Sequence, residues 1–201
     1  AGEPVWGSYY QSMLLPAQQD PVDVRYASQP VFLANLLVRV SDAGINDAQT
    51  AEDVLLHIDQ IVPFIELADL QVQKLSALTA HHLMAINAAA RLGVMGQPFA
   101  VEADAKNRKR LLRELEGMSV RVMDGKGRLL GRGKGSDVMG HPLRSVVWLA
   151  AALRKEGLSL QPGQWVSLGA LSPMFRPRAG EKVTVAYAGL TGVRPVGVRF
   201  Q

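Results

Sequence analysis

The chain has 201 residues, of which 48% are hydrophobic and 20% are charged. This composition is sufficient for a buried core and excludes a disordered chain, a collagen and a coiled coil. Cysteine is absent, which excludes disulfides, thiolate catalysis and cysteine-ligated zinc or iron–sulfur sites. No apolar run reaches the roughly 18 residues of a membrane span. The net charge of +4 is a mild excess, and solubility explains it more simply than nucleic-acid binding.

The first half of the chain predicts a buried strand, a helix and a second strand. Residues 1–30 contain repeated prolines and predict an irregular lead-in. The nearly continuous apolar run 31–40 predicts a strand that is buried on both faces. Thr50 can cap a helix whose apolar face extends to Val62, and Pro63 would end that helix. The segment 64–70 then predicts a short strand.

The second half of the chain is rich in predicted strands. Residues 119–123 and 128–131 flank Asp124-Gly125, which is a strong hairpin signal. The basic cluster 106–110 lacks aromatic residues and is typical of a solvated helix face. The segment 142–157 predicts the best helix, and strands follow at 165–168, 183–187 and 192–200. The fold class is therefore α+β, built on a mostly antiparallel and strongly twisted sheet or barrel.

A glycine-rich loop at 133–140 is a candidate anion site. It lacks the Lys-Ser/Thr of a Walker loop and the glycine spacing of a dinucleotide loop, so nucleotide binding is not expected. A loop that leads into a helix N-terminus can still bind a carboxylate. A tight connection between hairpin and helix is an equally good explanation.

Glu66 is the strongest single candidate for a functional residue, because it lies inside a segment that predicts an apolar strand. A buried carboxylate needs a partner, a metal ion or a raised pKa, unless Glu66 faces solvent on an edge strand. The histidines His57, His81, His82 and His141 form no HExxH pattern, so a histidine-based zinc site is not expected. Ser136 lies in no GxSxG motif, which makes a serine triad a weak hypothesis.

Several segments together resemble the 2-keto-4-pentenoate hydratase and oxalocrotonate decarboxylase branch of the fumarylacetoacetase superfamily. The most specific segment is Gly-His-Pro-Leu at 140–143 followed by Val-Val-Trp-Leu-Ala at 146–150. Other matching segments fall in family order and cover nearly the whole chain; they lie at 30–40, 63–69, 87–93, 160–174 and 192–200. The resemblance implies a twisted, mixed β-roll or barrel with a few flanking helices, formed by a single domain over 1–201.

The resemblance also implies a Mg²⁺ or Mn²⁺ ion that chelates a 2-oxo acid, held by a Glu-x-Glu pair and a third Glu. In this chain the pair falls on Leu33 and Asn35, and the third position is Glu66. Leu33 has no ligand atom and Asn35 offers only a neutral oxygen, whereas a hard cation prefers several anionic oxygens. The family's N-terminal region with its catalytic lysine has no counterpart upstream of Ala1. We therefore expect no bound metal cofactor.

The expected function is that of a hydratase-like protein without its divalent-metal site, either a binder of a small carboxylic acid or a non-catalytic subunit. The alternative is a metal-independent hydratase, tautomerase or decarboxylase acting on a 2-oxo or 2-hydroxydienoic acid, with Glu66 and His141 moving protons. In either case Glu66 should be protonated readily or pair with a base such as Lys134. The expected substrate-binding residues are Asn87, Ser136, Gly169 and Ala170.

The family implies a homo-oligomer or a complex with an active relative, and neither a nucleic-acid partner nor a membrane span is expected. The family is cytoplasmic, but an export signal removed before Ala1 would place the protein in the periplasm.

Overall fold

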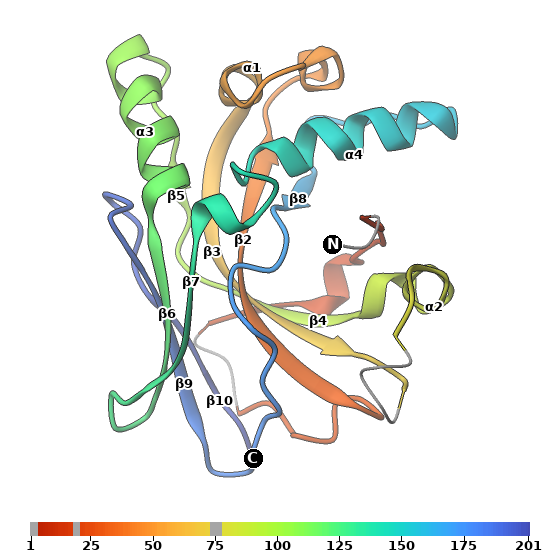
Figure 1. Ribbon diagram of the computed structural model, residues 1–201, viewed down its shortest axis with the longest axis vertical. Coiled ribbons are helices and arrows are strands. Elements are labelled where there is room, and N and C mark those ends of the chain that lie inside the picture. The colour runs from red at the N-terminus through yellow and green to blue at the C-terminus, as the bar shows by residue number, and fades with distance from the viewer. Residues whose placement is uncertain (1–3, 18–20, 73–77) are drawn as a thin grey trace.

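The computed structural model describes residues 4–17, 21–72 and 78–201. Two β-sheets pack against each other, and helices cover one end of the pair (Figure 1). Among the described residues no helix has the length and apolarity needed to cross a bilayer. This arrangement confirms the α+β class and the twisted mixed sheets expected from the sequence.

The larger sheet has six strands in the order β1-β4-β3-β2-β8, with β5 also pairing with β3. Its strands are β1 (Leu14–Pro16), β2 (Pro30–Val40), β3 (Ile58–Asp69), β4 (Ala90–Met95), β5 (Phe99–Ala100) and β8 (Trp165–Ser167). The β1–β4 pair is parallel and the other pairs are antiparallel. The lead-in expected to be irregular thus contributes a strand to the sheet edge.

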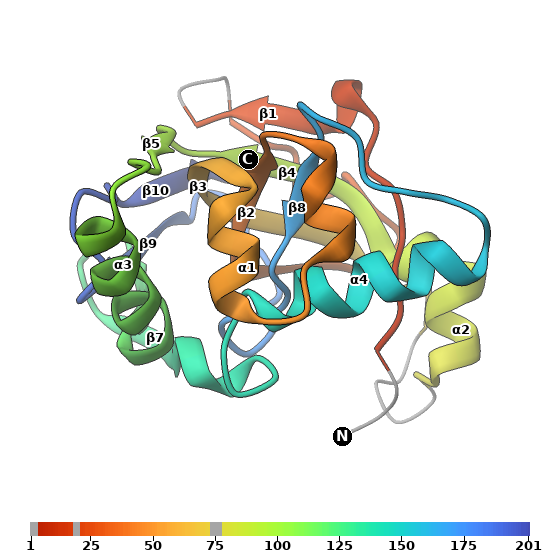
Figure 2. The ribbon, with the colours of Figure 1, turned by 90° about the horizontal axis from the view of Figure 1, so that it is seen from above.

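The smaller sheet has four antiparallel strands in the order β10-β9-β6-β7. They are β6 (Ser119–Asp124), β7 (Leu129–Lys134), β9 (Lys182–Ala188) and β10 (Val196–Arg199). The Asp124-Gly125 turn joins β6 to β7 as predicted, and Asp124 accepts hydrogen bonds from the backbone N–H groups of Lys126 and Arg128. One face of this sheet packs on β2 and β3, and among residues 4–17, 21–72 and 78–201 no helix lies on its other face (Figures 1 and 2).

The helices gather mainly at one end of the sheets. They are α1 (Ala51–Leu56), α2 (Ala80–Ala85), α3 (Ala105–Gly117) and α4 (Arg144–Lys155), with short 3-10 turns η1 (Gln11–Met13), η2 (Ala43–Asp47), η4 (Asn87–Ala89) and η5 (Gly135–Asp137). Seen from above, α1 lies between α3 and α4, whereas α2 lies to one side (Figure 2). The basic residues of α3 are on its solvent-exposed surface, as the sequence indicates.

The helix predicted to run from Thr50 to Pro63 is wrong in its second half. Thr50 does cap α1 in a capping box with Asp53, but the helix ends at Leu56 and Ile58 begins β3. Pro63 lies inside β3, where the strand changes partner from β4 to β5 and the Pro63 carbonyl accepts from the Gly96 N–H at 2.7 Å. Proline is tolerated in a sheet at such a break in the ladder.

The main core lies between the two sheets, and β2 sorts its side chains between this core and the opposite face. Phe32, Ala34, Leu36 and Val38 point into the core. Val31, Leu33, Asn35 and Leu37 alternate with them and therefore lie on the opposite face. That second face is also buried, which explains why the apolar run of β2 is nearly continuous.

Gly93 of β4 packs closely against the side chain of Phe64. A Cβ at this position would overlap the ring of Phe64, which is fully buried. We expect Gly93→Ala to lower the free energy of unfolding by about 1–3 kcal/mol, because the ring must move in a packed environment. Gly117→Ala is the matched control, since a Cβ there meets nothing within 4 Å. Chemical denaturation measures both, and equal stability of the two variants would contradict this packing.

Candidate functional site

The β2–β3 register brings the three positions of the expected metal site together. Leu33 pairs directly with Glu66, and Asn35 lies two residues further along the same face. Small apolar clusters flank these residues on both sides: Val31, Ala68, Leu70 and Ala89 at one end, and Leu37, Val62 and Phe64 at the other. Polar groups between them are confined to a small area of the sheet face.

Asn35 is the centre of a hydrogen-bond network on this face. Its side chain is fully buried, and its Nδ2 donates to Glu66 Oε2 at 2.9 Å and to Ser167 Oγ at 2.8 Å. Its Oδ1 accepts from the Leu36 backbone N–H at 2.7 Å. Both amide N–H donors are thus used, and Asn35 presents one N–H to the carboxylate and the other to the serine hydroxyl.

Glu66 is partly buried, and this burial raises its pKa against the opposing effect of the Asn35 donor. The buried phenolic oxygen of Tyr9 lies near Glu66, but it has no hydrogen bond of acceptable geometry to any residue that the structure describes. Burial, together with the negative charge of Glu66, raises the pKa of Tyr9 far above its ordinary value. The pair therefore favours protonated forms of both groups.

The donor set at this face does not fit a hard divalent cation. It offers one carboxylate at Glu66, an amide that donates one N–H to that carboxylate and the other to Ser167 Oγ, and the aliphatic Leu33, which is 5% exposed. Across residues 4–17, 21–72 and 78–201, no three or more His, Asp or Glu side chains lie close enough to share a metal ion. Mg²⁺ and Mn²⁺ prefer several oxygen ligands, so the residues present are a poor ligand set for either ion.

The expected substrate-binding residues fall in different places. Gly169 is joined to the network, because its N–H donates to Ser167 Oγ at 3.3 Å. Asn87 instead binds the N-terminal segment, with its Oδ1 accepting from the Ser8 N–H and its Nδ2 donating to the Ser8 carbonyl. Ser136 in η5 and Ala170 are both exposed. Their role in binding stays a prediction.

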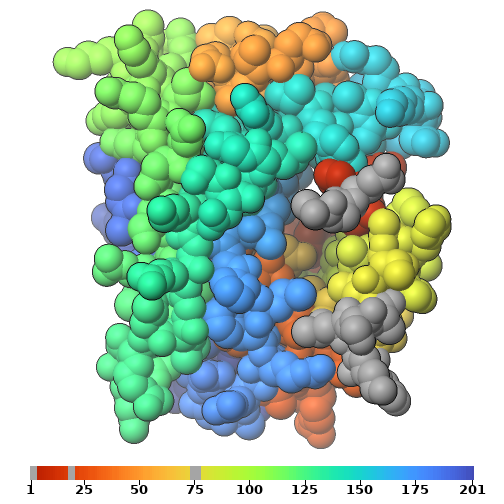
Figure 3. Space-filling view, viewed as in Figure 1, coloured from red at the N-terminus to blue at the C-terminus, as the bar shows by residue number. Residues whose placement is uncertain are grey.

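A recess opens on this side of the molecule. Figure 3 shows it between the blue chain that follows β8, the yellow residues of α2 and the red N-terminal segment. Atoms in the orange of β2 are visible at its floor.

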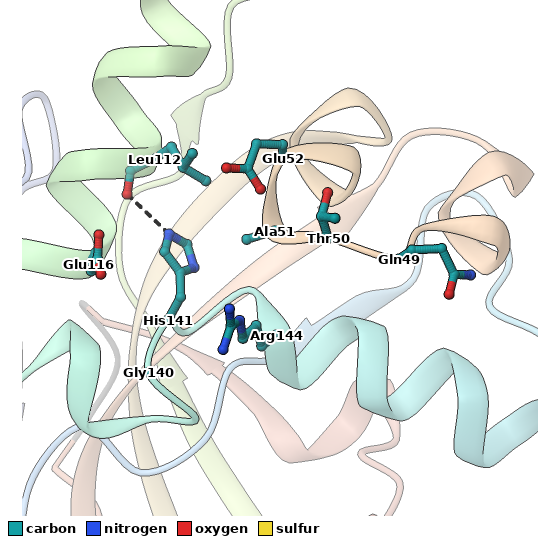
Figure 4. A pocket seen from close by; sticks show the side chains of 9 residues that line it. All are labelled: Gln49, Thr50, Ala51, Glu52, Leu112, Glu116, Gly140, His141 and Arg144. Carbon is teal, nitrogen blue, oxygen red and sulfur yellow. Dashed lines mark hydrogen bonds between the residues drawn. The ribbon is translucent and has the colours of Figure 1, made fainter.

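His141 lies elsewhere, in a cleft of about 580 Å³ between α1, α3 and α4. Its Nε2 donates to the Leu112 carbonyl at 3.0 Å, and its Nδ1 accepts from the Leu143 N–H at 3.1 Å (Figure 4). Burial lowers the pKa of His141, which agrees with a neutral ring. Glu66 does not line this cleft, so the structure does not bring the two expected catalytic residues together.

The expectation that Lys134 pairs with Glu66 is wrong. Lys134 ends β7 in the smaller sheet, and its side chain is exposed. The partners that the structure gives Glu66 are Asn35 and the nearby Tyr9. Sequence reasoning missed Tyr9 and Ser167, because nothing near them in the sequence marks them as neighbours of Glu66.

Comparison with known proteins supports the family resemblance. No family model matches the chain. The chain is 26% identical over 194 residues to the 2-keto-4-pentenoate hydratase of Paraburkholderia phymatum, covering 96% of this chain and 70% of that enzyme. It spans only about half the length of several other curated hydratases and decarboxylases that it matches.

Solved structures share the fold. The 4-oxalocrotonate decarboxylase from Pseudomonas putida G7, complexed with magnesium and adipate, superposes with a TM-score of 0.78 at 22% identity, covering 97% of this chain and 69% of that one. The fumarylpyruvate hydrolase from Pseudomonas aeruginosa, in complex with Mn²⁺ and pyruvate, gives 0.63 at 12% identity, covering 93% and 73%. A divalent metal is thus typical of these relatives.

The fold is fumarylacetoacetase-like, as in these solved structures. Within it, the predicted resemblance to the 2-keto-4-pentenoate hydratase and oxalocrotonate decarboxylase branch is confirmed.

Replacing Glu66 should change the pH dependence of stability. Its folded pKa lies above its value of 4.5 in an unfolded chain, so the folded state loses stability as pH rises from 4.5 through the raised pKa. Glu66→Gln removes this loss. We expect a melting temperature above wild type at about pH 8 and close to wild type at about pH 4.

Asp69, on the same strand, provides a control because its pKa is shifted in the opposite direction to that of Glu66. Burial acts to raise its pKa, but backbone N–H donors of Gln29 and Ser28 outweigh burial and lower it. Asp69→Asn should therefore destabilise most at neutral pH and least in acid, below the lowered pKa. If both variants lose stability most at neutral pH, the assignment for Glu66 is wrong.

Proposed function

We propose that the chain binds a small carboxylic acid at the Glu66 face, without a divalent metal ion. The observation that carries this proposal is the double donation of Asn35 Nδ2 to Glu66 Oε2 and Ser167 Oγ. An amide N–H carries partial positive charge, so it stabilises the carboxylate from the side on which a cation would otherwise bind. The opposite position on β2 is the aliphatic Leu33, which adds no ligand.

The same groups suit an acidic ligand. A protonated Glu66 can donate an O–H to a ligand carboxylate. An ionised Glu66 would instead repel the anion, so ligand binding and protonation should favour each other. Adipate, acetate and pyruvate are the carboxylates named with relatives of the same fold, which supports this ligand class.

A metal-independent enzyme is the second candidate function, and one observation favours it. Glu66, with its raised pKa, lies next to a buried tyrosine, and a neutral carboxyl can deliver a proton to a bound 2-oxo or 2-hydroxydienoic acid. His141 takes no part in this scheme, because its ring nitrogens hold α3 and the start of α4 together. Loss of turnover in Glu66→Gln with retained pyruvate binding would favour this candidate over a pure binder.

Restoring the missing carboxylates tests the metal proposal. The variant Leu33→Glu with Asn35→Glu places three carboxylates on one sheet face and should bind Mn²⁺ with a Kd of about 1 mM or tighter. Leu33→Gln with Asn35→Gln is the matched uncharged control and should not. Electron paramagnetic resonance of Mn²⁺ measures free ion directly. Millimolar or tighter binding by the wild type, lost in Glu66→Gln, would contradict the proposal.

The pH dependence of ligand binding tests the role of Glu66. Pyruvate is a suitable probe, because it stays ionised between about pH 5.5 and 8. Calorimetry should show affinity rising as pH falls, by up to about tenfold per pH unit above the raised pKa of Glu66. Glu66→Gln should bind pyruvate equally at both ends of this range. Affinity that rises with pH, or that requires added Mn²⁺, would overturn the proposal.

A further inference from the structure

The smaller sheet leaves one face uncovered, and this face is strongly cationic. Alternation along its strands points Val120, Val122, Val183 and Val185 into the core. The intervening residues point outward, and none of the helices in the described part of the chain covers them (Figures 1 and 2). We define this outer face by Ser119, Arg121, Met123, Leu129, Arg132, Lys134, Lys182, Thr184, Ala186, Ala188, Gly197 and Arg199.

The charges on the outer face are arranged in like-charge pairs. Arg121 on β6 pairs directly with Arg132 on β7. Lys182 on β9 pairs directly with Arg199 on β10. All four side chains are exposed, and none forms an ion pair with a residue that the structure describes. Like charges directly opposite in a sheet are destabilising, so folding alone does not account for this pattern.

The residues between the two like-charge pairs have small, uncharged side chains. Ala186 lies beside Arg121, and Lys182 lies four residues away on β9, so the pairs are roughly 13 Å apart along the strand. Ala186, Thr184 and Gly197 form the surface between them. No outward residue of this face carries a negative charge. The face therefore offers two separated cationic positions with small, uncharged residues between them.

We propose that this outer face docks an acidic protein surface, with carboxylates placed against the Arg121–Arg132 and Lys182–Arg199 pairs. Charge complementarity selects the partner, because a carboxylate next to each pair relieves the repulsion within it. Arginine, the residue type of Arg121, Arg132 and Arg199, is enriched in protein interfaces. A single-stranded nucleic acid fits less well, since the face has no aromatic side chain for base stacking. A second copy in a two-fold contact would place like charges against like.

A polyglutamate peptide is the probe that tests this surface, with calorimetry as the measurement. We expect wild type to bind it, and Arg121→Gln with Arg132→Gln to weaken binding by about tenfold or more. Lys182→Gln with Arg199→Gln should weaken it similarly. Lys106→Gln with Lys109→Gln removes two exposed charges from α3 and should change affinity by less than about twofold. Both double variants of the sheet should have a melting temperature equal to or above that of wild type, because each removes a repulsion between like charges. A melting temperature in this range shows that the variants fold.

Four results would overturn the proposal. Equal weakening in the α3 control would show that net charge alone attracts the peptide. Unchanged binding in both sheet variants would show that the peptide binds elsewhere. Tighter binding of an oligothymidylate of equal charge would assign the face to nucleic acid. Self-association of the wild type that Arg121→Gln with Arg132→Gln abolishes, measured by sedimentation without peptide, would assign it to a second copy.

Discussion

The contact between the Asn35 amide and the Glu66 carboxylate sets the character of the larger sheet's outer face. A lone carboxylate on a mostly apolar surface is costly unless something compensates its charge. Two effects compensate the charge of Glu66. Asn35 donates an N–H to its carboxylate, and burial raises its pKa and so favours the protonated, neutral form. The chemistry available at this face is that of hydrogen bonding and proton exchange, carried by the residues of the chain itself.

This contact depends on the register of β2 and β3. Direct pairing of Leu33 with Glu66 keeps Asn35 on the same side, and a shift of one residue would turn Asn35 into the core. The register is fixed by burial on both faces of β2, because Phe32 and Leu36 fill the main core while Leu37 fills the small outer cluster. Packing that stabilises the fold therefore also positions the polar groups.

The two sheets use their outer faces differently. The face with Glu66 is partly enclosed by the N-terminal segment, which Asn87 holds through Ser8. The face with Arg121 and Arg132 is exposed to solvent. The first arrangement suits a small ligand that must be desolvated, and the second suits a large partner.

The sequence predicted the fold better than the site. The apolar run of β2, the Thr50 cap and the Asp124-Gly125 hairpin depend on local patterns, and each was confirmed. The helix expected to reach Pro63 was wrong, because β-branched residues at a helical spacing also suit a buried strand and tertiary pairing decided between the two.

The special position of Glu66 could be predicted, because a carboxylate inside an apolar run is unusual. Its neighbours Tyr9 and Ser167 could not be predicted, since they come from segments far away in the chain. Conversely, His141 and Lys134 belong to matching or basic segments of the sequence, but the fold places them away from Glu66.

Infrared difference spectroscopy between wild type and Glu66→Gln tests the central claim most directly. In a pH titration, the account predicts a protonated-carboxyl band in the wild type that the variant lacks, that persists to higher pH than the band of an ordinary glutamate, and that Mn²⁺ does not change. A carboxylate band in its place, shifting when Mn²⁺ is added, would contradict the account.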